Sequence, residues 1–524
     1  MPAPAHQDQP PAGPQRIFAA RSAWPLHDQA QSRRIESTAL AGVAAGALMA
    51  RAGLATARLA LALAPHAERV LVLAGPGNNG GDGLIAAFHL KAQGKSVRVV
   101  HLADPARLPA DAAQALQQAR HAGVPVTAAL QGLDEPDLVI DALLGLGAAR
   151  PPEGDLARAI DMANAGQAPI LAIDLPSGLH PDTGSPVGSA AIHAAWTLSL
   201  LTLKPGLFTG QGRDHAGDPW FDVLGVTETE TPCAWLGPWA KAPQPDLPSR
   251  RHAQHKGSFG DLMVIGGAAG MTGAAALAGR AALTAGAGRV YLSLLDDAEH
   301  RSPMPELMLR KAAWLADART LSATTVVCGC GGGPPVADTL APLLIGAGRL
   351  LLDADALNAV ARDTGLQKLL ADRAARGQPT VLTPHPLEAA RLLGVSAAEV
   401  QADRLAAAAR LSQRLAAVVA LKGSGTVVAA PGHTPWINAS GNAALATAGS
   451  GDVLAGWIGG LWAQWPPSNS MTNLTLASAC ARHATWLHGH AADRHAFDAR
   501  GQVRTSPLPL RAGDLIEAMA AALG

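Results

Sequence analysis

A run of small residues near the C-terminus, Ala446–Gly456, contains an acid that could act beside a bound phosphate. Gly449 and Gly451 allow the backbone to approach a bulky anion. The apolar helix expected from Val453 to about Trp465 would present unpaired N–H groups at its positive end. Asp452 would stand in its first turn, where a carboxylate can take the proton from an attacking hydroxyl. The alternative is an ordinary glycine helix end followed by an aspartate cap.

A strand, a glycine loop and a helix follow one another in the first half of the chain. The apolar run Arg69–Leu73 predicts a buried strand, Gly75–Gly83 a loop, and the residues from Leu84 a helix. This is the anion-binding layout of a doubly wound sheet, although its G-x-G-x-x-G spacing is a weak signal by itself. No Lys-Ser/Thr pair follows, which argues against a Walker loop. Three side chains are too polar for a packing turn and are predicted to meet a ligand or cation: Asn78, Asn79 and Asp82.

Further strands in this half end in polar residues, at 137–141 and 169–174. Ligands bind at the carboxyl ends of parallel strands, so these residues are expected at one edge of the sheet. Three oxygen-bearing side chains could jointly hold a hard cation there, whereas any one of them alone could be a helix cap: Asn79, Asp141 and Ser177. Lys204 follows another expected strand and would either offset anionic charge at the same edge or be solvated.

The second half repeats the pattern of apolar strands followed by small or polar turns. Glycines follow the expected strand at 325–328 and suggest close approach of a ligand, with a flexible turn as the alternative. His385 is held between prolines at a strand end, where a structural and a functional histidine are both open readings. The turn Lys422–Thr426 combines a lysine, hydroxyls and glycines, a composition suited to a nucleotide diphosphate.

Composition bounds the class of protein. The chain has 524 residues, enough for two or three domains, and its net charge of zero argues against nucleic acid as a partner. Four cysteines are too few for a disulfide framework, so buried, inert thiols are expected. The N-terminal residues lack the apolar core of a signal peptide, and Arg51 and Arg58 interrupt the apolar stretch at 39–65. We therefore expect no membrane span and a cytoplasmic location.

Taken in order, the motifs resemble two known families. Gly75–Gly83, Asp141–Gly147 and Asp174–Gly178 are similar to the NAD(P)H-hydrate epimerase domain. The later motifs resemble the ADP-dependent NAD(P)H-hydrate dehydratase, and comprise His255–Gly260, Gly266–Ala275, Thr383–His385, Lys422–Thr426 and Gly449–Asp452. The resemblance implies an α/β chain, with a Rossmann-like three-layer α/β/α domain before a ribokinase-like α/β domain. The expected divisions are a flexible tail at 1–19, an epimerase domain at 20–228, a linker at 229–249 and a dehydratase domain at 250–524.

For the first domain, the resemblance implies a set of residues in contact with the hydrated dinucleotide: Asn78, Asn79, Gly80, Gly81, Asp82, Gly145, Leu146, Gly147, Ala148, Ala149, Arg150, Pro151 and Asp174. Asp174 would contact the damaged nicotinamide ring and transfer the proton, with Lys204 as an electrostatic helper. Asn79, Asp141 and Ser177 would ligate a potassium ion.

For the second domain, the resemblance implies that Ala274, Gly331, His385 and Asp452 bind the hydrate. Residues of two turns would bind the adenine nucleotide: Lys422, Gly423, Ser424, Gly425, Thr426 and Gly451. ADP would be the co-substrate, Mg²⁺ would accompany its phosphates, and Asp452 would be the catalytic base. One departure from the family is Cys330, which stands in the glycine run where the family usually has proline.

The implied function is repair of hydrated NADH and NADPH (NADHX and NADPHX). The first domain would interconvert the R and S epimers, and the second would dehydrate the S epimer to NAD(P)H, AMP and phosphate. A homo-oligomer is expected, with no nucleic-acid or membrane partner. The alternative is a ribokinase-type small-molecule kinase fused to a non-catalytic dinucleotide-binding module, because the phosphate cradle serves any hydroxyl acceptor. The preference for ADP over ATP follows from the resemblance alone.

Overall fold

The chain forms two compact units. The computed structural model describes residues 13–17, 23–131, 134–147, 150–227, 230–237, 250–296, 304–311, 317–465, 473–496 and 509–523. The first unit contains Pro25–Ala234 with Met1–Phe18, and the second contains Trp235–Gly524 with Ala19–Trp24. The chain therefore crosses from one unit to the other inside β2 (Trp24–Leu26) and β10 (Ala234–Leu236).

An eight-stranded sheet organises the described part of the first unit, in the order β1-β9-β8-β7-β6-β3-β4-β5. Neighbouring strands are parallel except β1 and β9. The strand order reverses between β3 and β6, which makes this gap the topological switch point. The strands are β1 (Gln15–Arg16), β3 (Arg69–Ala74), β4 (Ser96–His101), β5 (Val126–Thr127), β6 (Leu138–Ala142), β7 (Ile170–Ile173), β8 (Trp196–Leu200) and β9 (Asp218–Asp222).

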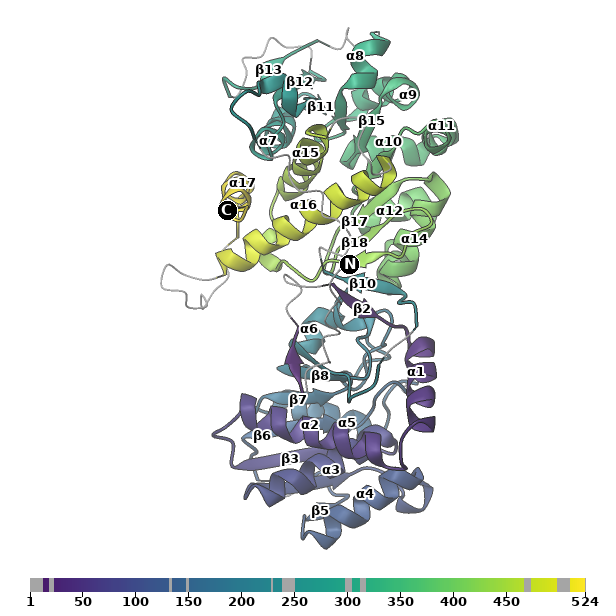
Figure 1. Cartoon of the computed structure of the whole chain (residues 1–524), viewed down its shortest axis with the longest axis vertical. Coiled ribbons are helices and arrows are strands. Elements are labelled where there is room, and N and C mark those ends of the chain that lie inside the picture. The colour runs from purple at the N-terminus through teal and green to yellow at the C-terminus, as the bar shows by residue number, and fades with distance from the viewer. Residues whose placement is uncertain are drawn as a thin grey trace, which may run out of the picture. The chain divides into compact units, whose positions relative to one another are not determined.

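Helices cover both faces of this sheet, because its central strands are apolar on both sides. One core joins Val72 to Leu84, and a second, on the other face, joins Leu71 to Ile160. The unit is thus a Rossmann-like three-layer α/β/α domain, as predicted (Figure 1). Its helices are α1 (Gln29–Ala41), α2 (Ala47–Leu63), α3 (Asn78–Ala92), α4 (Ala110–His121), α5 (Asp155–Ala165) and α6 (Gly212–Ala216), with 3₁₀ turns η1 (Pro105–Arg107) and η2 (Pro205–Leu207).

Three details of this unit differ from expectation. Helix α3 begins at Asn78 rather than Leu84, so the polar residues expected on a loop stand in the first turns of a helix. Part of the expected N-terminal tail is strand β1, which pairs with β9. Part of the expected linker is strand β10, which pairs with β19 (Trp436–Ile437), while residues 238–249 lie outside the described ranges.

The sheet of the second unit is also mostly parallel, within an eleven-stranded order β13-β12-β11-β14-β15-β16-β17-β18-β19-β10-β2 among the described residues. Strands β13 to β17 are parallel to their neighbours, and β18 runs antiparallel. A second switch point lies between β11 and β14. The strands are β11 (Asp261–Gly266), β12 (Arg289–Leu294), β13 (Met308–Leu309), β14 (Thr325–Cys328), β15 (Arg349–Leu352), β16 (Thr380–Leu382), β17 (Val418–Leu421) and β18 (Val427–Ala429).

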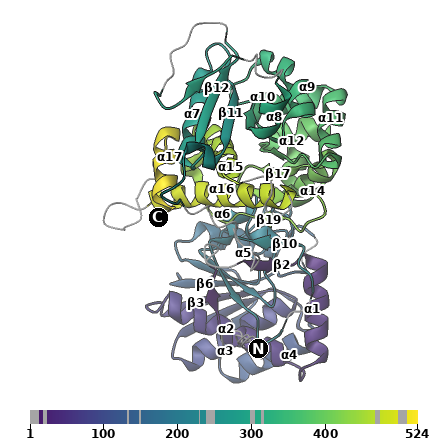
Figure 2. The same ribbon diagram turned by 45° about the horizontal axis from the view of Figure 1, so that its top comes forward.

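Helices flank this sheet as well, and α17 packs against α7 and α16 (Figure 2). Among the described residues, no helix combines the length and apolar composition that crossing a bilayer requires. The helices are α7 (Thr272–Thr284), α8 (Ala318–Ala323), α9 (Ala337–Gly346), α10 (Ala354–Arg362), α11 (Thr364–Ala375), α12 (Pro386–Leu393), α13 (Ala397–Ala402), α14 (Arg404–Leu415), α15 (Ser450–Ala463), α16 (Asn473–His495) and α17 (Ala512–Ala521), with 3₁₀ turns η3 (Lys256–Phe259), η5 (Pro334–Val336) and η6 (Ala443–Leu445).

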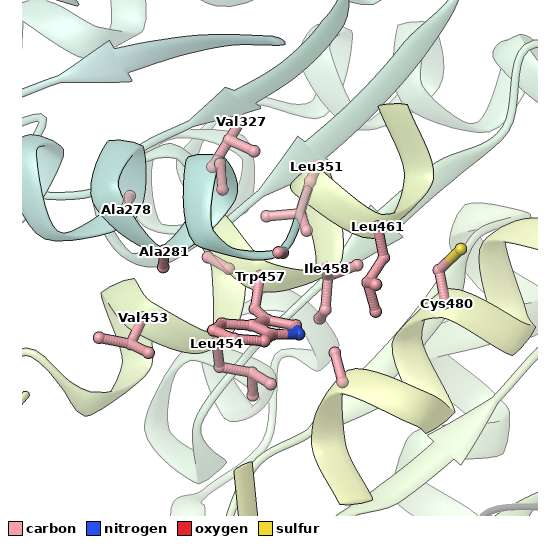
Figure 3. Packing of buried hydrophobic residues seen from close by; sticks show 14 of the residues in the cluster. Ala278, Ala281, Val327, Leu351, Val453, Leu454, Trp457, Ile458, Leu461 and Cys480 are labelled. Carbon is pink, nitrogen blue, oxygen red and sulfur yellow. The ribbon is translucent and has the colours of Figure 1, made fainter. Parts of the chain in front are cut away.

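Helix α15, the helix of the predicted phosphate cradle, is buried against α7 and the sheet. Figure 3 shows its residues Trp457 and Ile458 packed near Ala278 and Ala281 of α7. The two helices approach closely at Gly456, where a Cβ atom would lie 2.1 Å from the carbonyl oxygen of Ala278. Because a packed core resists displacement, this contact holds the N-terminal turn of α15 in one position.

We predict that Gly456→Ala destabilises the second unit by about 1–3 kcal/mol, because the added methyl group overlaps backbone that cannot move freely. Urea unfolding of the whole chain measures this as a lower midpoint. The matched control is Gly273→Ala in α7, where nothing lies within 4 Å of the new Cβ; it should change stability by less than about 1 kcal/mol. Equal midpoints for the two variants would contradict the close packing.

Candidate functional site

A cavity of about 430 Å³ opens in the first unit at the switch point. Its walls come from α1, α2, the start of α3 and the loop after β6, together with Asp174 and residues 200–202. The loops after β3 and β6 meet here, because a Cβ at Gly75 would lie 1.8 Å from the carbonyl oxygen of Leu143. The cavity therefore lies where open parallel sheets bind ligands.

Asp174 and Lys204 form an ion pair in this cavity. The Lys204 side chain is fully buried and its Nζ donates to Asp174 Oδ1, while Asp174 is 13% exposed and lines the cavity. Lys204 Nζ also donates to Ser199 Oγ at 3.3 Å and to the Leu200 carbonyl at 3.0 Å. The alternative that Lys204 is solvated is wrong. Asp174 has φ 68°, a conformation that non-glycine residues adopt rarely and that occurs most often at functional sites.

The predicted cation-binding oxygens come together beside the same cavity. Asp141 is fully buried; its carboxylate accepts the Ser177 hydroxyl at 2.6 Å and the Ser177 N–H at 2.8 Å. Burial raises the pKa of Asp141 to about 6. Asn79 donates to the Leu144 carbonyl at 3.0 Å, and its buried Oδ1 has no hydrogen-bond partner among the described residues. An orphaned buried oxygen next to a buried carboxylate fits a hard cation.

The other predicted residues of this site divide into two groups. Asn78, Asp82, Gly145, Leu146 and Gly147 line the cavity. Gly80 and Gly81 serve packing instead, since added Cβ atoms would meet Gly75 and Met49. The cavity lining does not include Arg150 or Pro151, and Ala148 and Ala149 lie outside the described residues.

The sequence reasoning missed Glu36, which lines the cavity from α1. Burial raises its pKa, and the nearby Asp174 carboxylate raises it further. No local pattern could have revealed this residue, because its approach to the site depends on how α1 packs.

In the second unit, the start of α15 has the features of an anion site. Gly449 precedes the helix with φ 86°, and Asp452 lies in its first turn, partly exposed. The N–H groups of Gly449, Gly451 and Asp452 donate to no described residue. Unpaired N–H groups at a helix N-terminus stabilise a phosphate. The alternative of a plain aspartate cap is wrong, because Asp452 lies inside the helix and Gly449 occupies the cap position.

Asp452 lies among charged and polar groups from other strands. Ligating atoms of Cys330, Asp353 and Asp452 are within 4.8 Å of one another. Asp353 is buried and accepts from Lys422 Nζ at 2.6 Å and from the Thr383 hydroxyl at 2.8 Å. Burial, followed by the Asp353 carboxylate, raises the pKa of Asp452 to about 6, although a hydrogen bond with Cys330 and the Lys422 charge act in the opposite direction. The sequence reasoning assigned no role to Asp353, although its place at a strand end was the available signal.

The predicted nucleotide turn connects β17 to β18. Its Lys422 N–H donates to the Pro384 carbonyl at 2.8 Å, and the buried Arg404 guanidinium donates to the Lys422 carbonyl at 3.1 Å. A Cβ at Gly451 would lie 3.4 Å from Lys422 Nζ. The turn and the start of α15 are therefore adjacent, as a shared nucleotide site requires.

The remaining predicted residues of this unit lie nearby on other elements. His385 caps α12 by accepting the N–H groups of residues 387 and 388, and its Nε2 lies 3.2 Å from Glu388 Oε1. Burial lowers the pKa of His385. His385 thus caps α12, while its ring remains partly exposed.

Ala274 and Gly331 meet across the second switch point, where a Cβ at Gly331 would lie 2.9 Å from that of Ala274.

Comparison with known proteins assigns a family to each half of the chain. Residues 45–206 match the family described as YjeF-related protein N-terminus, and residues 262–510 match the family described as NAD(P)H-hydrate dehydratase. The chain is 39% identical over 508 residues to the bifunctional NAD(P)H-hydrate repair enzyme Nnr of Escherichia coli, covering 93% of each. It is 36% identical to the Coxiella burnetii enzyme of the same name, covering 92% of this chain and 98% of that one. A structure of the ADP/ATP-dependent NAD(P)H-hydrate dehydratase from Bacillus subtilis, co-crystallised with ATP and Mg²⁺, has 27% identity and a TM-score of 0.41, covering 53% and 93%.

Two α/β units with polar sites at their switch points thus define a two-domain enzyme of the NAD(P)H-hydrate class. More particularly, the chain belongs to the bifunctional NAD(P)H-hydrate repair enzymes. The predicted recognition, fold class and enzyme class are confirmed.

We predict that Lys204→Met destabilises the chain by about 3 kcal/mol, because it leaves the nearly buried Asp174 carboxylate without its cation. Urea unfolding measures the loss. The double variant Asp174→Asn with Lys204→Met removes both charges and should recover most of the stability. If the two substitutions instead destabilise additively, the ion pair makes no direct contribution.

Proposed function

We propose that the chain repairs hydrated NADH and NADPH, with the first unit exchanging R and S epimers and the second dehydrating the S epimer with ADP. The observation that carries the proposal is the position of Asp452 beside three unpaired N–H groups and next to Lys422. A base, a phosphate cradle and a cation are the parts that phosphoryl transfer to a hydroxyl needs.

In the dehydratase unit, Asp452 takes the proton from the C6 hydroxyl of the hydrate as this oxygen attacks the terminal phosphate of ADP. The N–H groups at the start of α15 stabilise the charge on the transferred group, and AMP leaves. Loss of the C5 proton and of phosphate then restores the reduced ring. Mg²⁺ on the phosphates supplies charge neutralisation when bound. Lys422–Thr426 and Gly451 hold the nucleotide, while Ala274, Gly331 and His385 hold the hydrate.

In the epimerase unit, Asp174 transfers a proton at the damaged ring, and Lys204 is its ion-pair partner. Asn79 Oδ1, Asp141 and Ser177 would hold K⁺, which would supply a fixed positive charge beside the cavity. The residues of this site that line the cavity contact the dinucleotide. A cytoplasmic location and a homo-oligomer stay predictions.

Incubation with mixed NADHX epimers and ADP tests the function directly. Recovery of NADH absorbance with stoichiometric AMP and phosphate is expected, and a parallel reaction with ATP measures the nucleotide preference. A phosphorylated hydrate that accumulates without elimination would contradict dehydration and favour a kinase.

We predict that Asp452→Asn lowers the dehydratase kcat by at least about 10²-fold while ADP binding is retained, because the variant removes only the base. Calorimetric titration with ADP is the control for binding. In the wild type, kcat/KM should rise with pH through the Asp452 pKa of about 6, because the ionised carboxylate is the active form. Near-normal turnover in the variant would refute the assignment.

We predict that K⁺ raises the thermal unfolding midpoint of the wild type relative to Li⁺ at equal ionic strength, since an ion bound only by the folded state stabilises it. Asp141→Asn should abolish the increase. The matched control is Asp137→Asn, at the partly exposed residue before β6; it should leave the K⁺-dependent increase unchanged, even if it alters the stability of the chain itself. An increase of equal size in both variants would rule out this ion site.

A further inference from the structure

Carboxyl groups from different elements line the cavity of the first unit, and three of them differ in their partners. Glu36 comes from α1, Asp82 from α3 and Asp174 from the end of β7. Asp174 accepts from Lys204 Nζ and, at 3.3 Å, from the Leu200 N–H. Within the described ranges, no hydrogen bond or ion pair engages the carboxyl group of Asp82 or of Glu36. Asp174 is therefore ion-paired, whereas Asp82 and Glu36 have no paired cation among the described residues.

The surroundings of Asp82 favour its protonated form. Burial raises the pKa of Asp82 well above its usual value, and the Asp174 and Glu36 carboxylates raise it further. Burial also raises the pKa of Glu36, but Lys204 and Arg33 act in the opposite direction there. Asp111 of α4 adds a further acid to the lining. Asp82 has no paired cation among the described residues, whereas Asp174 is paired with Lys204. Two acids in one cavity that differ in this way are suited to opposite roles in proton transfer.

We propose that Asp82 is the general acid of the epimerase unit, paired with Asp174 as the general base. The inference rests on the proposed function and deepens it. Strand β6 separates β3, which leads into the helix of Asp82, from β7, which leads to Asp174. The two groups therefore reach the cavity from separate elements.

The step balances without any further reactant. Asp82 gives its proton to the C6 hydroxyl, the C–O bond breaks with its electrons leaving on water, and the N1 lone pair forms an N1=C6 double bond. Water then attacks C6 from the opposite face, the double-bond pair returns to N1, and the extra proton passes to Asp174. The cation between these two events lies beside the newly ionised Asp82, which stabilises it. Reversal, or proton exchange with water in the cavity, restores both acids.

The test is Asp82→Asn in the whole chain, with epimer exchange followed by chromatography of NADHX in the absence of ADP, so that the dehydratase unit is idle. The exchange kcat should fall by at least about 10²-fold with little change in KM, the usual contribution of a general acid. In the wild type, the rate should decline as pH rises through the titration of Asp82, and the variant should lack this decline. Asp82→Glu keeps an acid and should recover part of the rate and the decline.

Two readouts separate this role from a structural one. With ADP, dehydration of the S epimer by Asp82→Asn should match the wild type, because the second unit is untouched. Infrared difference spectra of wild type against Asp82→Asn at neutral pH should show a protonated carboxyl band. If that band is absent, or if Glu36→Gln loses the exchange activity that Asp82→Asn retains, the assignment is overturned. If the wild type itself does not exceed spontaneous exchange, the proposed epimerase function fails as well.

Discussion

Both units depend on the close approach of two loops at the point where the strand order reverses. A Cβ at Gly75 would lie 1.8 Å from the Leu143 carbonyl oxygen, and one at Gly266 would lie 2.2 Å from the Cys330 carbonyl oxygen. In each unit, the loops that follow the two strands at the reversal run to opposite faces of the sheet. A crevice for a ligand therefore opens at the carboxyl ends of these strands. Because Gly75 and Gly266 have no side chain, the loops can approach closely. The polar residues that follow neighbouring strands therefore lie within reach of one another.

The two sites share an arrangement of charged residues. Each places a lysine against an aspartate, Lys204 with Asp174 and Lys422 with Asp353, and surrounds the pair with further acids. Burial near negative charge raises the pKa of the neighbouring acids Glu36, Asp82 and Asp452. In the epimerase unit the proposed base is the lysine-paired Asp174, whereas in the dehydratase unit it is Asp452, which lies beside the pair.

The two sites were predicted from sequence to different extents. The oxygen cluster of Asn79, Asp141 and Ser177 was reachable, because all three residues follow strands that end at one edge of a sheet. Asp452 was reachable for the same reason, at the start of an apolar helix. Glu36 and Asp353 were not assigned, since helix α1 carries no local sign of a site and Asp353 shows its partners only when β15, β16 and β17 are aligned. The start of α3 was misplaced because its polar first turn reads as a loop.

By itself the sequence determined the α/β class of both units, the order of their strands along the chain and the glycine-bearing turns where ligands can approach. These follow from local patterns of apolar residues, glycine and polar strand ends. Only the tertiary structure decided which carboxyl groups share a cavity and which of them forms an ion pair with a lysine. It also decided that Gly80 and Gly81 pack against other residues and do not line the cavity. The reason is physical: protonation and packing depend on neighbours that are distant in sequence, and those neighbours are set by how the layers meet.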